Sequence, residues 1–324
     1  SPLAYNEDSL YLAAENAVKA LVGKGIIEGD GKTLRPLSSL TRAETAVILI
    51  NAVDSVNPSA NQGGMQPPSG NMPGGFGGSD TVTQGTSATT ITEGGTYSST
   101  SYSSTGDDEN ALRVDGATVT LDSVTVDKSA GSSSNTEDGD FYGQNAALLA
   151  TNGANVTIKN ATVNSSAQNG NGIFSYGTGT TVNVSDSTIT TTADNSGGIQ
   201  TTGGGTTNAT NLTVNTSGNS AAAIRSDRGG GTVVVDKGTY TSNGYNSPAV
   251  YSTADITVSN ATLTANNSES LVIEGKNSIK LNNCDVLGNM SSTEGSSSDE
   301  NVHNVMIYQS MSGDAEVGTS EFDM

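Results

Sequence analysis

The sequence predicts an all-β fold, a right-handed parallel β-helix (β-solenoid), with a small α-helical segment at its N-terminal side. The first observation is a valine-rich strand pattern that recurs about every 25 residues from residue 119 onward. The second is composition: 33% of the 324 residues are hydrophobic, 4% are aromatic and none is Trp. That is a poor supply for the core of a compact globule, whereas stacked coils of short strands need only a thin core.

The main strand pattern occurs seven times. Its copies begin at Val119, Val156, Val182, Thr207, Val233, Ile256 and Ile279, so their starts are 37, 26, 25, 26, 23 and 23 residues apart. The long first step contains an insertion around residues 131–145. Because side chains alternate along a strand, Val119, Leu121, Val124 and Val126 and their equivalents are predicted to point inward.

A second strand pattern follows the same rhythm. Its copies are headed by Leu112, Leu148, Ile173, Ile199, Ile224, Val250, Val272 and Met306. Two strands in each repeat, separated by turns rich in Gly and Asn, are typical of the coils of a parallel β-helix.

The alternation in the main pattern breaks at one position, which predicts a bend. The residues there are Ser123, Asn160, Asp186, Asn211, Lys237, Asn260 and Asn283. Asn and Asp tolerate the left-handed backbone conformation of turns, and residues stacked about 4.8 Å apart can form hydrogen bonds along the column. The pattern resembles the asparagine ladder of pectate-lyase-type β-helices. We expect this fold over residues 81–324, with a coil end at residue 324 that the chain itself or another subunit continues.

The N-terminal part has a different character. Residues 1–57 carry helical periodicity, including a capping box formed by Thr41 and Glu44. Residues 58–80 are rich in Gly and Pro and are interpreted as a linker.

One stretch of the N-terminal part resembles an S-layer homology (SLH) repeat. The matching residues are Leu21-Val22-Gly23-Lys24-Gly25-Ile26-Ile27-Glu28-Gly29-Asp30, Leu34-Arg35-Pro36 and Leu40-Thr41-Arg42-Ala43-Glu44. In that family the arginine of the corresponding motif contacts cell-wall polymer, so the resemblance makes Arg42 a binding candidate. The family usually combines three repeats and only one is present here. A small helical cap, with Arg42 in a structural role, is the alternative.

The charge balance excludes some partners. Thirteen Lys and Arg against 33 Asp and Glu give a formal net charge of −20. Nucleic acids and anionic membranes bind through clustered cations, so we expect neither as a partner. No apolar run is long enough to span a bilayer, so no membrane insertion is expected.

The residue after each second-strand head is predicted to point outward. This column consists of Arg113, Leu149, Phe174, Gln200, Arg225, Tyr251, Ile273 and Ile307. Exposed apolar residues in a row mark a contact surface, and Tyr or Phe beside Arg could stack on sugar rings. Leu149, Phe174, Arg225, Tyr251, Ile273 and Ile307 are therefore candidates for binding a saccharide or another subunit. The alternative is that the loop 127–145 of the same chain covers the column.

Weak candidates for catalysis lie next to Arg225. β-helix polysaccharide lyases use an Arg or Lys base beside aspartate-bound calcium, and Arg225, Asp227 and Arg228 resemble that arrangement. An Arg–Asp pair that stabilises a glycine-rich turn is the competing interpretation.

Calcium requires several converging oxygens. The acidic loop that contains Asp138 and Asp140 is the best candidate for a Ca²⁺ site, and acidic turns exposed to solvent are the alternative.

Taken together, the sequence favours an extracellular protein of the bacterial cell surface. A structural, adhesive or self-assembling role without catalysis is the leading hypothesis, with the protein itself or a cell-wall or extracellular polysaccharide as partner. The alternatives are a carbohydrate-binding β-helix and a pectate-lyase-like polysaccharide lyase.

Overall fold

The computed structural model describes residues 81–290, 302–310 and 314–324, all of which belong to the second of two units, residues 74–324. The predictions for residues 1–57, for residues 58–80 and for Arg42 lie outside the described residues.

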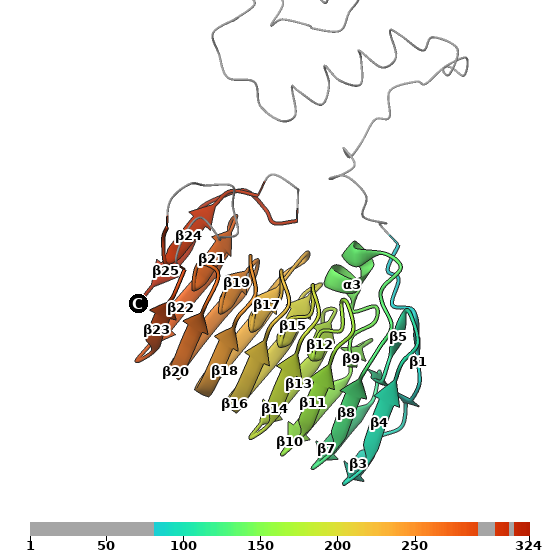
Figure 1. Ribbon diagram of the computed structural model, residues 1–324. Helices are drawn as coiled ribbons and strands as arrows, with labels where there is room; N and C mark the ends of the chain where they lie inside the picture. Colours follow the sequence, from blue (N-terminus) through green and yellow to red (C-terminus); the bar gives the residue numbers. More distant parts are fainter. Residues whose placement is uncertain (1–80, 291–301, 311–313) are drawn as a thin grey trace, which may run out of the picture. The chain divides into compact units, whose positions relative to one another are not determined.

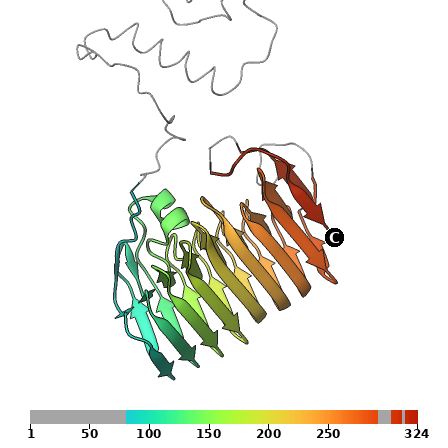
Figure 2. The same cartoon turned by 180° about the vertical axis from the view of Figure 1, so that it is seen from behind.

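The described residues form a parallel β-solenoid, which confirms the predicted fold class (Figure 1). Successive coils follow one another along a rod, as the view from behind also shows (Figure 2). Strands of neighbouring coils pair in parallel in each of the large sheets. The only helix among the described residues is α3 (Thr136–Tyr142).

Two large sheets and one small one make up the coils. The fourteen-stranded sheet contains β3 (Gly95–Ser98), β4 (Ser101–Ser104), β7 (Thr118–Asp122), β8 (Thr125–Lys128), β10 (Asn155–Lys159), β11 (Thr162–Ser165), β13 (Thr181–Ser185), β14 (Thr188–Thr191), β16 (Gly205–Thr216), β18 (Gly231–Ser242), β20 (Asp255–Ala265), β22 (Ser278–Asn282), β23 (Asp285–Gly288) and β25 (Glu321–Asp323). The nine-stranded sheet contains β2 (Thr90–Ile91), β6 (Leu112–Asp115), β9 (Leu148–Thr151), β12 (Ile173–Tyr176), β15 (Ile199–Thr202), β17 (Ile224–Ser226), β19 (Val250–Ser252), β21 (Leu271–Glu274) and β24 (Val305–Tyr308). Strands β1 (Thr86–Ser87) and β5 (Glu109–Asn110) form the small sheet.

The main repeat stacks in the predicted register. The strand pairings align Val119 with Val156, Val182, Thr207, Val233, Ile256 and Ile279 in turn. Inward side chains from both large sheets form one continuous core in which most are below 5% exposed. Burial of each Val, Ile or Leu contributes about 1.5–3 kcal/mol, so each coil is stabilised mainly through its contact with its neighbours.

The second repeat was predicted correctly for six copies and wrongly for the last two. Leu112, Leu148, Ile173, Ile199, Ile224 and Val250 stack in register, but the next heads are Leu271 and Val305, not Val272 and Met306. Ile273 is consequently fully buried in the core, and Ile307 lies in the same inward column. The error arose because Leu271, Val272 and Ile273 are all apolar, and such a run does not reveal which residues point inward.

The predicted bend column is confirmed. All seven residues from Ser123 to Asn283 adopt the left-handed conformation, with φ between 49° and 64°. The hydrogen-bonded ladder is only partial. Asn211 Nδ2 donates to Asp186 Oδ1 (2.7 Å) and Asn283 Nδ2 donates to Asn260 Oδ1 (2.9 Å), whereas Asn260 Nδ2 donates to Asp236 Oδ1 (2.7 Å), beside the column.

A second left-handed column was not predicted. Asn145, Asn169, Asn195, Ser220 and Asn246 have φ between 52° and 67°. They occupy the turns that precede β9, β12, β15, β17 and β19 of the nine-stranded sheet. Both columns rely on the same property, because Asn reaches the left-handed region at a lower cost than most other non-glycine residues.

The long insertion covers part of the outward face of the nine-stranded sheet with α3 (Figure 1). The helix is capped by Asn135, whose side chain accepts a hydrogen bond from the backbone N–H of Glu137, and it ends at Gly143 with φ of 81°. A Cβ atom on Gly143 would lie 2.7 Å from Leu149 Cδ1, so only glycine allows this close approach. Leu149 and Phe174 are fully buried and pack with Ala146 and Tyr176. At Leu149 and Phe174, therefore, the outward column is covered by the chain's own loop, which was the alternative to a contact surface.

Replacing Asn260 tests the left-handed column. We expect Asn260→Ala to lower the free energy of unfolding by about 1–2 kcal/mol, because Ala enters the left-handed region at that cost and the bonds to Asp236 and Asn283 are lost. Asn260→Gly loses the same bonds but enters the left-handed region without the steric cost of a Cβ atom, so it should retain more stability than Asn260→Ala. Thermal unfolding followed by circular dichroism measures both, and equal losses in Ala and Gly would contradict the argument.

Candidate functional site

A cavity of about 320 Å³ opens on the outward face of the nine-stranded sheet, next to α3. The residues around it include Glu137, Asp140, Phe141, Asn195, Arg225, Asp227, Asn246, Tyr251, Tyr308 and Asp314. They come from α3, from the strands and turns of several coils, and from the segment that follows β24. This size lies at the lower end of the range for small-ligand sites.

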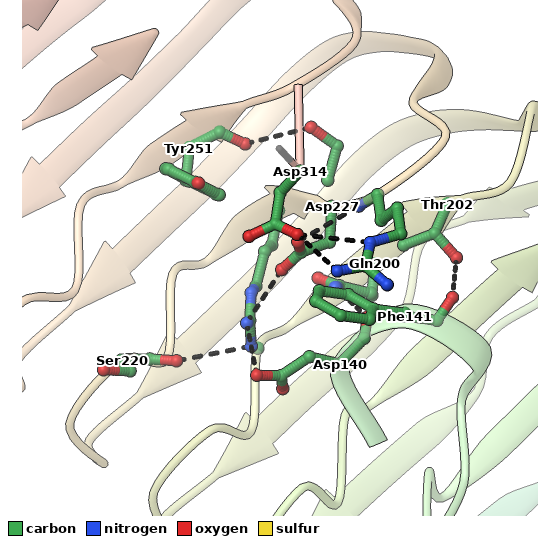
Figure 3. Close-up of polar contacts among 12 residues, drawn as sticks. Asp140, Phe141, Gln200, Thr202, Ser220, Asp227, Tyr251 and Asp314 are labelled. Atoms are coloured by element: carbon green, nitrogen blue, oxygen red, sulfur yellow. Dashed lines mark hydrogen bonds and ion pairs between the residues drawn. The ribbon is translucent and has the colours of Figure 1, made fainter. Parts of the chain in front are cut away.

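Arg225 connects the site, because it pairs with both Asp140 and Asp227, two of the side chains labelled in Figure 3. Its place on β17 is in register with Gln200 on β15 and Tyr251 on β19, so all three belong to the outward column. Arg225 Nη2 lies 3.1 Å from Asp140 Oδ2 and 3.1 Å from Asp227 Oδ2. Arg225 and Asp227 are only 7% and 6% exposed. Without Arg225, two carboxylates would be left buried with no counter-charge, which is strongly destabilising.

Two side-chain amides hold Asp140 in place. Asn169 Nδ2 donates to Asp140 Oδ1 at 2.9 Å, and Gln200 Nε2 donates to the Asp140 backbone carbonyl at 2.9 Å. Because Asp140 also contacts Arg225, the helix is tied by polar contacts to three coils of the solenoid.

Arg228 joins α3 to the C-terminal segment. Its guanidinium donates to Asp314 Oδ1 from Nη2 (2.8 Å) and from Nε (3.2 Å), and its Cζ lies 4.1 Å from the centre of the Phe141 ring. The stacking on Phe141 is a cation–π contact. One side chain therefore connects two segments that are far apart in the sequence.

Two tyrosines line the cavity and share one buried acceptor. Tyr308 Oη donates to Glu274 Oε2 at 2.8 Å, and Tyr251 Oη donates to the same oxygen. Glu274 is 4% exposed. Both rings are consequently fixed in position along one wall of the cavity.

Burial and crowding shift the protonation of the carboxylates. Burial raises the pKa of Asp227 to about 7, and the negative charges of Asp140 and Asp314 add to the effect of burial while Arg225 opposes it. Burial likewise raises the pKa of Asp140. Burial disfavours the charged form of Arg225, but Asp140 and Asp227 outweigh it and keep the pKa of Arg225 above its ordinary value. The site therefore holds a fixed cation beside a carboxyl group that titrates near neutrality.

The structure brings together some of the residues predicted from the sequence and separates others. Arg225, Asp227 and Tyr251 line the cavity and Arg228 lies beside it. Leu149 and Phe174 are buried under α3. The prediction that Ile273 points outward is wrong, since it lies in the core, and Ile307 is 47% exposed on the last strand of the inward column.

The calcium prediction stays a prediction. Asp140 is paired with Arg225, and Asp138 lies on α3 outside the set of residues that line the cavity. In the ranges that the structure describes, no three or more His, Cys, Asp or Glu side chains are grouped to hold a metal ion.

Sequence reasoning missed Glu274, Tyr308 and Asp314. Glu274 and Tyr308 were missed because their strands were predicted one residue out of register. With Val272 as the first inward residue, Glu274 would also point into the core. An unpaired carboxylate there would be costly, and this could have revealed the error. Nothing in the local sequence indicates that Asp314 reaches Arg228 across 86 positions.

Comparison with known proteins identifies only the N-terminal part. The model of the S-layer homology domain matches residues 11–46, which include Arg42. No curated protein and no solved structure matches the chain. The match indicates an extracellular protein anchored at the bacterial cell surface and fits a cell-wall polymer as partner. None of the helices in the described part of the chain has the length and apolar character of a membrane span.

The raised pKa of Asp227 predicts a pH-dependent stability. The folded state holds this proton more tightly than the unfolded chain, whose Asp has a pKa near 3.8. This group's contribution to the free energy of unfolding therefore falls as pH rises from about 4 to about 7 and is level above that. Asp227→Asn removes this contribution. The difference in melting temperature, variant minus wild type, should therefore increase from pH 5 to about pH 7 and stay constant from there to pH 8. Parallel pH profiles for the two proteins would contradict the assignment.

Proposed function

We propose that the protein is an adhesive surface protein whose SLH segment attaches to the cell wall and whose solenoid binds a saccharide in the cavity beside α3. The role is binding, without cleavage of the saccharide. The cell-surface location supports access to such a ligand.

The observation that carries the proposal is the pair of tyrosines on the cavity wall. Tyr251 and Tyr308 are held by a common hydrogen-bond acceptor, Glu274, so their rings are ordered before a ligand arrives. Fixed aromatic rings offer a flat apolar surface for one face of a sugar. Asn195 and Asn246 also line the cavity, and their amides can donate to and accept from sugar hydroxyls.

The charges around the cavity argue against an acidic polysaccharide as ligand. Glu137, Asp140, Asp227 and Asp314 line it with Arg225 as the cation. A polymer of uronic acids would meet net repulsion there. The lyase hypothesis, which requires such a substrate, is therefore disfavoured, and a neutral or cationic saccharide fits better.

The ion pairs favour binding over catalysis. Asp140 and Asp227 share Arg225, and Asp314 is paired with Arg228. Glycosidases use two carboxyl groups placed on either side of the scissile bond, one to donate a proton and one to attack or activate water. Carboxylates that are engaged with guanidinium groups of the same protein serve the shape and charge of the cavity instead.

Assembly of the solenoid with further copies is a second candidate, favoured by one observation. Ile307 occupies an inward position yet is 47% exposed. Association with another copy would cover it. We expect sedimentation velocity of the whole protein to show species larger than the monomer, and Ile307→Asp to reduce them. A wild-type protein that stays monomeric at high concentration would overturn this candidate.

Removal of the Tyr251 ring tests the saccharide-binding proposal. We expect Tyr251→Ala to weaken binding of the best ligand from a panel of neutral and amino oligosaccharides by about two- to tenfold, the loss of one stacking contact of about 0.5–1.5 kcal/mol. Tyr245→Ala is the matched control, because Tyr245 is 48% exposed and does not line the cavity. Isothermal titration calorimetry measures the affinity, and equal effects of the two variants would contradict the proposal.

A further inference from the structure

The cavity contains more buried negative charge than the protein neutralises. A single nitrogen of Arg225 serves two carboxylates, Asp140 and Asp227. Among the residues that the structure describes around the cavity, the other guanidinium is that of Arg228, which is paired with Asp314. Buried carboxylates need a counter-charge or a proton, so this arrangement lacks one positive charge.

The surroundings of the cavity also lack hydrogen-bond donors. Among the described residues, four buried side-chain oxygens on α3 or in contact with it have no hydrogen-bond partner: Glu137 Oε2, Asp138 Oδ1, Asn169 Oδ1 and Gln200 Oε1. Asp138, Asn169 and Gln200 are at least nine-tenths buried, and Glu137 lines the cavity itself. All four are acceptors. Unsatisfied buried acceptors are rare, and of these four residues only Glu137 lines the cavity, where an N–H donor of a ligand could reach it.

We infer that the saccharide bound in this cavity is an amino sugar, whose primary ammonium group lies against the carboxylates of Asp140 and Asp227. The inference rests on the proposed function and specifies its ligand class. An ammonium group has one positive charge and three donors, so it would add a counter-charge beside Asp140 and Asp227, which share one nitrogen of Arg225, and a donor near Glu137. The hydroxyls of the same sugar would contact Asn195 and Asn246, and its apolar face would lie on Tyr251.

A proton competes with the ammonium group for this place. Asp227 is surrounded by Arg225 on β17, Asp140 on α3, Asp314 of the C-terminal segment, the hydroxyls of Tyr251 and Tyr308, and the backbone N–H of Arg228. At pH 5 to 6 the carboxyl holds its proton, since its pKa is about 7. A cationic ligand must release that proton to gain the ion pair. Affinity for an amino sugar should therefore rise with pH up to about 7.

The test compares three β-1,4-linked tetrasaccharides that differ at one substituent: glucosamine, N-acetylglucosamine and glucose. Calorimetry with the full chain is run at pH 5, 6 and 7, below the pKa of about 8 of an α-amino group, and a titration of the free tetramer gives its charge at each pH. We expect the glucosamine tetramer to bind at least about tenfold more tightly than the other two at pH 7, the gain from one charge-assisted hydrogen bond. Its affinity should fall by up to tenfold per pH unit toward pH 5, and buffers of different ionisation enthalpy should report release of up to one proton.

Two isosteric variants locate the effect. Asp227→Asn should reduce the preference for glucosamine and flatten the pH dependence. Asp285→Asn, which removes the same charge from the exposed face of β23, should change neither. Circular dichroism and melting temperature confirm that both variants are folded.

The possible failures are distinguishable. Equal affinity for the three tetramers, or a preference that Asp227→Asn does not alter, would overturn the amino-sugar inference and leave saccharide binding in place. No binding of any saccharide would overturn the proposed function as well. Binding of Ca²⁺ alone that depends on Asp227 and excludes glucosamine would show that a metal ion supplies the missing charge.

Discussion

The structure depends on one constraint: equivalent residues of successive coils must stack in register along parallel strands. Each coil buries its inward valines and isoleucines largely against the coils before and after it, because a single turn has too small a core of its own. The same register brings the left-handed Asn and Asp residues into columns. It also determines which outward residues are neighbours. Gln200, Arg225 and Tyr251 meet because they occupy the same position on adjacent strands, so the site is a consequence of the stacking.

The site forms where the regular repeat is interrupted. The outward column is apolar at Leu149 and Phe174, which α3 covers, and it becomes polar at Gln200 and Arg225. α3 belongs to an insertion in an early coil, while Asp314 follows the last strand of the nine-stranded sheet. Arg225 contacts the first segment and Arg228 contacts both. A repetitive scaffold thus supplies rigidity, and two non-repetitive segments supply the walls of the cavity.

The sequence was sufficient for the features that repeat and insufficient for those that occur once. The register of Val119, Val156 and Val182 could be predicted because alternation and spacing act together in every copy. Hydrophobicity alone could not show which of the three consecutive apolar residues from Leu271 onward point inward. The position of Glu274 could have shown it, because a carboxylate is not expected to point into the core. The contacts of α3 and of Asp314 arise from tertiary packing between distant segments, and no periodicity encodes them. For this reason Arg225 and Asp227 were recognised as a pair while most of the cavity around them was not.

The balance of charge links the stability of the site to its proposed use. Two buried carboxylates that share one guanidinium cost free energy unless another positive charge or a proton neutralises them. The stability of the solenoid does not require such a pair on a face that α3 and the C-terminal segment already cover. In the absence of a ligand, the proton on Asp227 relieves part of that cost. A ligand that replaces the proton with its own positive charge gains an interaction that neutral sugars lack. The same imbalance that makes the cavity a poor structural element is what the proposed amino sugar would relieve, so the proposed selectivity follows from a charge deficit that the fold leaves in place.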